Sequence, residues 1–213
     1  MVNVHTFSKK EELVNALSHG IGLVFSIFAI TVLVIKASVY GNAWHIVSYS
    51  IYGVTMILLY VSSTLLHALP VGKAKSVFEI LDHSSIYFFI AGTYTPFLFV
   101  IAETAVRWTL FGIIWGIAIG GTVFKVFFVR KFKLFSTLLY VGLGWMFVLI
   151  LKPTIDFLPQ RGTILLISGG AFYTLGAIFY VWRGFKHHHA VWHSFVLLGT
   201  FLHFCVIYFY LTP

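Results

Sequence analysis

Long uninterrupted apolar runs are the feature that most restricts the fold of this chain. Stretches such as 21–35 and 164–181 contain no charged residue. A helix that crosses a bilayer needs about 20 apolar residues, whereas a membrane β-barrel needs short alternating strands. Charged residues make up only 9% of the chain, against roughly 25% in soluble domains. The sequence therefore predicts an all-α integral membrane protein and excludes a soluble fold and a barrel.

Breaks in the apolar runs divide the chain into seven predicted spans. Charged or turn-forming residues separate them, as at 40–42 and 130–133. The predicted spans are 16–36, 43–69, 82–101, 108–128, 134–151, 163–182 and 190–211. No connection is long enough to form a second domain. We therefore predict a single seven-helix transmembrane domain over 1–213, in which 1–15 is a short cytoplasmic segment.

Lysine and arginine are distributed unevenly between the two sides of the predicted bundle. With seven spans, ten of them fall on the side of the N-terminus and four on the other side. Connections rich in Lys and Arg stay in the cytoplasm, so we expect the N-terminus in the cytoplasm and the C-terminus outside. This orientation is opposite to that of G-protein-coupled receptors. A retinal protein is also disfavoured, because the last predicted span has no lysine for a Schiff base.

The formal net charge of +8 is carried by short connections and not by a folded basic face. We therefore expect no nucleic-acid partner, and anionic lipid headgroups as the counterparts of these cations. The expected location is the cell (plasma) membrane, crossed several times. Cys205 is the single cysteine, so it can form no intramolecular disulfide, and we expect a small buried residue. The sequence leaves the oligomeric state open.

Ionisable side chains inside membrane spans, or at their ends, are candidates for function because they are costly in a bilayer. Few are present here, and most lie at predicted span ends. The predicted orientation places them at one depth, on the cytoplasmic side. They are His67 at the end of the second span, Asp82 and His83 at the start of the third, and His189 and His193 at the start of the seventh.

His189 and His193 are four residues apart, which places both imidazoles on one helix face, as helical zinc sites require. His67 adds a third nitrogen and leaves the fourth tetrahedral position open, as in catalytic zinc sites. We therefore predict a Zn²⁺ site, with Asp82 placed to orient or deprotonate a water molecule. The alternatives are an interfacial histidine pair that bonds headgroups or water and, for His67, a buried histidine at a helix end.

Other polar residues are expected to support this site. Ser63 lies one turn before His67 and is a candidate catalytic hydroxyl. The alternative is that Ser63 bonds the carbonyl one turn earlier in its own helix. Glu12, Asn15 and His19 form one polar stripe at the start of the first span. This stripe is either a charged helix start or part of the metal site's supporting shell.

The remaining histidines are not expected to bind this metal. His187 and His188 extend a three-histidine run, but only its third member has a helical partner one turn further on. His203 lies ten residues past His193, roughly 15 Å along a helix. We expect His203 to form an interhelical hydrogen bond, with a proton path as the alternative.

These motifs together resemble the progestin and adipoQ receptor (PAQR) superfamily and, within it, the bacterial hemolysin III proteins. The matching motifs run from the first predicted span to the last. They are Glu12-x-x-Asn15-x-x-x-His19, Ser63-x-x-x-His67, Leu81-Asp82-His83-Ser84-Ser85 followed by Gly92-Thr93-Tyr94-Thr95-Pro96, and His189-x-x-x-His193. The resemblance implies seven helices and a zinc ion held by His67, His189 and His193. It also implies that Asp82 contacts zinc-bound water.

The resemblance implies two functions and does not choose between them. Eukaryotic members look like ceramidase-type amide hydrolases or receptors with such activity, whereas bacterial members are named for lysis of red cells. We expect a zinc-binding membrane protein, with zinc-dependent hydrolysis of a membrane lipid amide or ester by Asp82 and Ser63 as its extension. The sequence leaves open whether any reaction is catalysed.

Two alternatives come from other functional classes. A pore-forming cytolysin would fit the name, but the chain is very hydrophobic for a secreted toxin, and no predicted helix is strongly amphipathic. A transport or membrane homeostasis protein would use His19 and His203 in a proton or ion route. The scarcity of charge in mid-membrane weakens this alternative.

Overall fold

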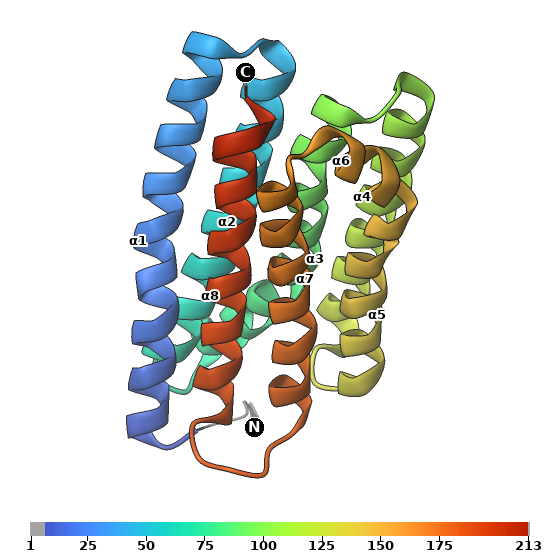
Figure 1. The fold of residues 1–213 in the computed structure, drawn as a ribbon. Helices are drawn as coiled ribbons and strands as arrows, with labels where there is room; N and C mark the ends of the chain where they lie inside the picture. The colour runs from blue at the N-terminus through green and yellow to red at the C-terminus, as the bar shows by residue number, and fades with distance from the viewer. Residues whose placement is uncertain (1–6, 213) are drawn as a thin grey trace.

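The computed structural model describes residues 7–212, and every regular element in this range is helical (Figure 1). A 3₁₀ turn, η1 (Met146–Ile150), links α5 to α6, and a π-helical turn, η2 (Ile207–Leu211), ends the last helix. The α-helices are α1 (Lys9–Tyr40), α2 (Ala43–Ala68), α3 (Lys73–Ile101), α4 (Thr104–Phe128), α5 (Lys133–Trp145), α6 (Leu151–Phe157), α7 (Gln160–Val181) and α8 (His188–Val206).

Seven helical segments in the described range are long and apolar enough to cross a membrane. Five are single helices, while the fifth span runs through α5, η1 and α6 and the last through α8 and η2. On α1, the outward-facing Leu17, Ile21 and Val24 are 59%, 68% and 70% exposed. Lipid is the solvent in which such a surface is stable. The prediction of an all-α, multi-pass membrane protein is confirmed.

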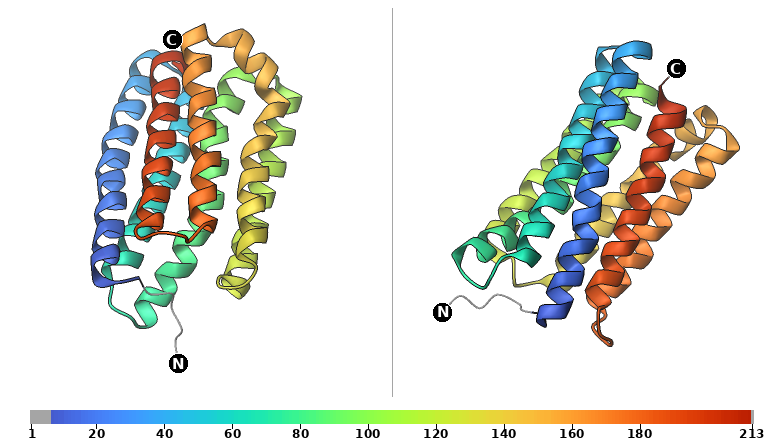
Figure 2. Two further views of the ribbon diagram at one scale, coloured as in Figure 1. Left: turned by 60° about the horizontal axis from the view of Figure 1, so that its bottom comes forward. Right: turned by 90° about the vertical axis from the view of Figure 1, so that its left-hand side faces the viewer.

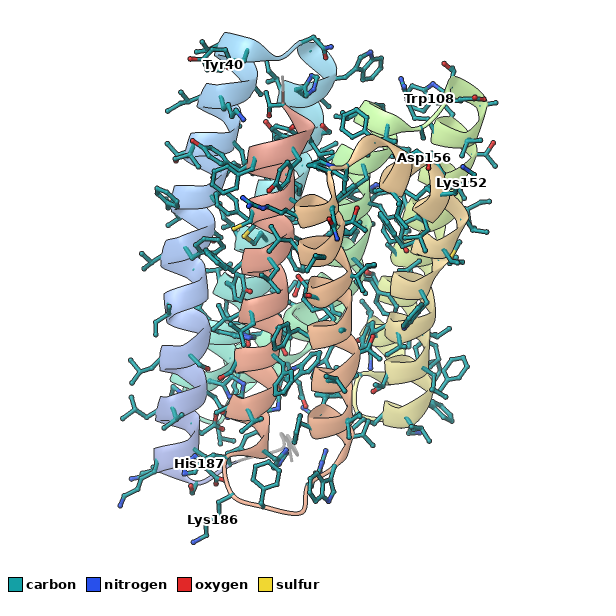
Figure 3. The ribbon with its side chains drawn as sticks, viewed as in Figure 1. Tyr40, Trp108, Lys152, Asp156, Lys186 and His187 are labelled. Atoms are coloured by element: carbon teal, nitrogen blue, oxygen red, sulfur yellow. The ribbon has the colours of Figure 1, made fainter. Side chains whose placement is uncertain are left out.

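The spans form a bundle in which the helix axes are roughly parallel and consecutive spans run in opposite directions (Figures 1 and 2). α1 packs against α2 and α8, α3 packs against α2 and α4, and α7 packs against α8 and α5. Figure 3 places Lys186 and His187 at one end of the bundle and Tyr40, Trp108 and Asp156 at the other. Successive connections lie at alternate ends of the bundle, so most of the Lys and Arg residues fall at the first of these ends. We term it the basic end.

The first helix begins before the predicted span, which started at residue 16. Ser8 caps α1: its Oγ accepts a hydrogen bond from the Glu11 N–H at 3.3 Å. The Glu11 carboxylate accepts one in return from the Ser8 N–H at 3.1 Å. This reciprocal pair is a capping box. The added turns place Glu12 and Asn15 inside α1, on the same helix as His19.

The third helix also begins earlier than predicted, at Lys73 and not near residue 82. The prediction that Asp82 starts this span was therefore wrong. Two charges in the added turns are buried but paired. Lys75 Nζ lies 3.0 Å from Glu12 Oε1 on α1, and the buried Glu79 carboxylate lies 2.6 Å from Arg130. Ion pairs reduce the cost of burying charge near a membrane interface.

The fifth span continues beyond residue 151, where the prediction ended it, because Pro153 does not break the helix. Pro153 lies in the first turn of α6, where a backbone N–H has no partner within the helix. Exposed Lys152 and Asp156, on either side of it in the chain, form an ion pair of 2.7 Å one turn apart. A proline in a first helical turn is therefore compatible with a continuous span.

The predicted orientation can be tested with single cysteines at two exposed positions that Figure 3 labels at opposite ends. In a Cys205→Ala background, we expect Asp156→Cys to react with a membrane-impermeant maleimide on intact cells. Lys186→Cys should react only after lysis, because connections rich in Lys and Arg are retained in the cytoplasm. The reverse labelling pattern would place the basic end outside.

Candidate metal centre

Three histidines from two distant parts of the chain meet at the basic end. His67 lies in the last turn of α2, and His189 and His193 lie in the first two turns of α8. One potential ligand atom of each lies within 4.8 Å of the others. The ring centroid of His67 lies 5.1 Å from that of His189 and 5.3 Å from that of His193. The structure therefore brings together the three predicted ligands, in a group that could hold a metal ion.

The surroundings of His67 fit a metal ligand. Its Nδ1 lies 2.7 Å from the Glu12 carboxylate on α1. A carboxylate accepts hydrogen bonds, so Nδ1 carries the proton and Nε2 keeps its lone pair. This Nε2 is buried and has no hydrogen-bond partner among the described residues. An unpaired buried nitrogen is costly, and a metal ion would satisfy it.

His193 is oriented in a similar way by Ser18, a residue that the sequence analysis missed. Ser18 Oγ lies 2.8 Å from His193 Nδ1 and donates its own hydrogen to the Asn15 carbonyl at 2.8 Å. With the hydroxyl proton used there, Ser18 Oγ accepts a hydrogen bond from the Nδ1–H tautomer of His193, in which Nε2 keeps the lone pair. The ring of His19 stacks on His193, with centroids 3.4 Å apart. Two α1 residues thus fix this imidazole.

Lys75 extends the support around Glu12. Its Nζ donates to Glu12 Oε1 at 3.0 Å and to the Leu66 and Leu69 carbonyls, at the end of α2, at 2.8 and 3.3 Å. The cation therefore binds free carbonyls of a helix C-terminus and holds the carboxylate that orients His67. No sequence spacing indicates this role, because Lys75 and Glu12 are far apart in the chain and come into contact only in the folded bundle.

Aromatic rings surround the remaining ligand. His189 is half-buried, and its ring centroid lies 5.0 Å from that of Phe7 and 6.2 Å from that of Tyr180. Phe7 also lies 6.0 Å from His67. Its ring therefore contacts two of the three histidines and reduces the access of water to them.

Asn15, His19 and Ser63 leave unused polar groups beside the histidines. Both amide atoms of Asn15, both ring nitrogens of His19 and the Ser63 hydroxyl are buried without a hydrogen-bond partner among the described residues. The alternative role for Ser63, a bond to its own helix, was wrong. Its neighbour Ser62 makes that bond, to the Leu58 carbonyl at 2.6 Å. Such a set of unpaired groups is available to water or a ligand.

Asp82 lies outside the group of three histidines. It is 8% exposed, and its carboxylate lies 3.9 Å from His83 Nδ1. His83 Nδ1 itself lies 2.7 Å from the Glu79 carbonyl. The role of Asp82 beside a metal-activated water stays a prediction.

His203, His187 and His188 lie outside the group of three histidines. His203 Nε2 on α8 lies 3.1 Å from the Leu166 carbonyl on α7, so the predicted interhelical hydrogen bond is confirmed. His187 donates its backbone N–H to Glu11, and His188 lies 3.4 Å from the Phe179 carbonyl. Neither belongs to the group of three. Cys205 is a free, half-buried cysteine.

Fold and site define a multi-pass membrane protein with seven apolar spans and three clustered histidines at one end of the bundle. Residues 7–204 match the family described as Haemolysin-III related, and the chain belongs to this family. No solved structure gives a significant match.

Named relatives agree with this assignment. A Hemolysin-3 homolog from Bacillus subtilis (strain 168) is 50% identical over 204 residues, covering 95% of this chain and 96% of the relative. Hemolysin-3 from Bacillus cereus is 48% identical, covering 96% and 93%. The Monocyte to macrophage differentiation factor of Homo sapiens is 29% identical over 180 residues, covering 80% and 73%. The resemblance to hemolysin III proteins is therefore confirmed.

The contact between Glu12 and His67 predicts the effect of Glu12→Gln on metal affinity. We expect zinc to bind about tenfold more weakly or worse, because a neutral amide orients the imidazole less strongly than a carboxylate. A competition titration with a chromophoric chelator measures this change. Glu11→Gln is the matched control, since Glu11 is adjacent and bonds no metal-site imidazole. Equal affinity in wild type and Glu12→Gln would exclude this role.

Proposed function

We propose that the protein is a zinc-binding protein of the cell membrane that hydrolyses an amide or ester bond of a membrane lipid. One observation carries the proposal. The buried, unpartnered Nε2 of His67 lies in a group with two other imidazoles, while its Nδ1 is held by Glu12. A histidine used only for packing would gain nothing from this arrangement.

The set of donors is one that catalytic zinc sites use. His67, His189 and His193 would hold the ion with three neutral nitrogens and leave one position open, as in catalytic zinc sites. Bound zinc supplies Lewis-acid activation of water and of a carbonyl group. Glu12 and Ser18 fix the orientation of two ligands before metal binding, which reduces the cost of assembling the site.

The chain's own residues provide the remaining steps. Asp82 accepts a proton from the water that attacks the lipid carbonyl carbon. Ser63 donates its hydroxyl hydrogen to the carbonyl oxygen as negative charge develops there. The bond from carbon to nitrogen or ester oxygen then breaks, and Asp82 returns the proton to the leaving group. The unpaired Ser63 hydroxyl supports this assignment, because it is committed to no other partner among the described residues.

A lipid-facing groove supports approach of the substrate from the membrane. It has a volume of about 650 Å³ and is lined by apolar residues of α1 and by Thr64 of α2. Two lining residues, Gly20 and Thr64, directly follow His19 and Ser63 in the chain. An acyl chain in this groove would therefore lie at the depth of His19 and Ser63, on the outer face of the same two helices.

Lysis of foreign membranes is the second candidate function, favoured by the two relatives named Hemolysin-3. The exposed face of α1 is apolar along its length, with Leu13, Leu17 and Ile21 all more than half exposed. A helix of this kind suits a resident membrane protein better than the lining of an aqueous pore. Lysis would then follow from lipid hydrolysis in the target membrane.

The proposed role of Asp82 predicts that Asp82→Asn keeps the metal but loses hydrolysis by about 100-fold or more, because the amide cannot accept the proton. Turnover of fluorogenic lipid amides and esters in nanodiscs, with zinc content measured on the same sample, tests this. Asp156→Asn is the control, since Asp156 lies exposed at the other end. Undiminished turnover in Asp82→Asn would remove Asp82 from the mechanism. A zinc-loaded wild type that cleaves no lipid would refute hydrolysis.

The two candidate functions predict opposite behaviour of His189→Ala. If lysis results from metal chemistry, purified wild-type protein lyses red cells and His189→Ala does not. Release of haemoglobin measures both. Equal lysis by the two proteins would support a pore that needs no metal.

A further inference from the structure

A buried cation lies on α4, away from the helices that carry the three histidines. Lys125 is 1% exposed, and its Nζ lies 5.8 Å from the centroid of the Tyr140 ring on α5. Among described residues, no carboxylate lies within 4.0 Å of its ammonium group. Lysines near the ends of membrane helices normally extend outward to the headgroups. Lys125 instead points into the protein.

Three buried hydroxyls on α3, α4 and α5 also lack partners among the described residues. They are Tyr87 Oη on α3, Thr122 Oγ1 on α4 and Ser136 Oγ on α5. Thr122 precedes Lys125 by three residues on the same helix, so the two lie on one face. The ammonium group and the three hydroxyls therefore come from three helices that pack against one another.

Tyr140 and Gly121 show that these groups converge. The ring of Tyr140, which faces Lys125, lies 4.4 Å from the ring of Tyr87. Ser136 precedes Tyr140 by one helical turn. A Cβ atom on Gly121 would lie 2.6 Å from Tyr87 Cζ, the carbon that carries the hydroxyl. The phenol end thus lies directly against α4, one turn from Lys125.

The charges around this cluster leave positive charge in excess. Arg130 donates two hydrogen bonds to Glu79, at 2.8 and 2.6 Å, so that carboxylate is already paired. Asp82 lies beside His83. Lys133 adds a second cation, which donates to the Tyr180 carbonyl and lies 4.1 Å from the centroid of its ring. A buried cation without a counter-charge is unfavourable, so an anion would stabilise this part of the bundle.

We propose that Lys125, Tyr87, Thr122 and Ser136 form a binding site for one monoanionic oxygen group of a membrane lipid. Such a group is the phosphodiester of an anionic phospholipid or the carboxylate of a fatty acid. One ammonium balances one negative charge, and the hydroxyls donate to its oxygen atoms. Lys125 lies in the last turn of α4 at the basic end, the depth at which headgroups lie. The site shares no residue with the metal centre and does not rest on the proposed hydrolysis.

The test measures the binding of defined lipids to the purified full-length protein. Native mass spectrometry counts the bound lipids, and the melting temperature reports the stabilisation that they give. The probes are phosphatidylglycerol, oleate and zwitterionic phosphatidylcholine. We expect one tightly bound anionic lipid per chain, bound at least about tenfold more weakly by Lys125→Met, because a charge-assisted contact is lost. Lys131→Met is the matched control: Lys131 is exposed at the same end and should bind as wild type. Whichever of phosphatidylglycerol and oleate binds more tightly shows whether the site takes a phosphodiester or a carboxylate.

Milder variants keep the test decisive if Lys125→Met does not fold. Ser136→Ala and Tyr87→Phe each remove one hydroxyl and should weaken binding several-fold, whereas Lys125→Arg should retain it. Equal binding of phosphatidylcholine by wild type, or unchanged binding in all site variants, would overturn the proposal. Acetate or inorganic phosphate that binds as tightly as the lipids would overturn the lipid assignment. Binding by His193→Ala should equal that of wild type, which separates this site from the metal centre.

Discussion

Polar groups inside a bilayer must find partners within the protein, and this constraint organises the whole structure. Helices satisfy the backbone, and side-chain pairs such as Lys75 with Glu12 satisfy most buried charges. Further from the basic end, Tyr60 and Tyr173 both bond the Thr200 hydroxyl, at 2.9 and 3.0 Å. The exceptions are therefore informative. Apart from Ser84 and His203, the unpaired buried groups of the described residues belong to the surroundings of the three histidines and of Lys125, the two places where we infer ligands.

The first helix provides much of the order at the metal centre, although it contributes none of the three ligands. Its residues Glu12 and Ser18 orient His67 and His193 respectively, and His19 stacks on the ring of His193. The capping box at Ser8 extends α1 far enough to bring Glu12 to this depth. His67 on α2 and His193 on α8 thus depend on hydrogen bonds from α1, which determine which ring nitrogen carries the proton and which is free to bind a metal.

Much of the fold and part of the site could be predicted from the sequence. Apolar runs give the seven spans because the bilayer fixes their length, and four-residue spacing gives the pair His189 and His193. The start of α1 could have been predicted, because Ser8 and Glu11 form a capping box that is visible in the sequence. The start of α3 could not, since its buried charges are paired with residues distant in the chain. Ser18 and Lys75 were missed for the same reason. Unpaired hydroxyls such as that of Ser136 become visible only when the packing is known.

Zinc content of the purified protein, measured by elemental analysis, tests the central claim most directly. The comparison is wild type against His67→Ala and His193→Ala, with His203→Ala as a control, because His203 is a buried histidine bonded to Leu166 and outside the site. The account predicts about one zinc ion per chain in wild type and in the control, and loss of zinc in the other two variants. A folded wild-type protein without zinc, or zinc retained in His67→Ala and His193→Ala, would contradict it.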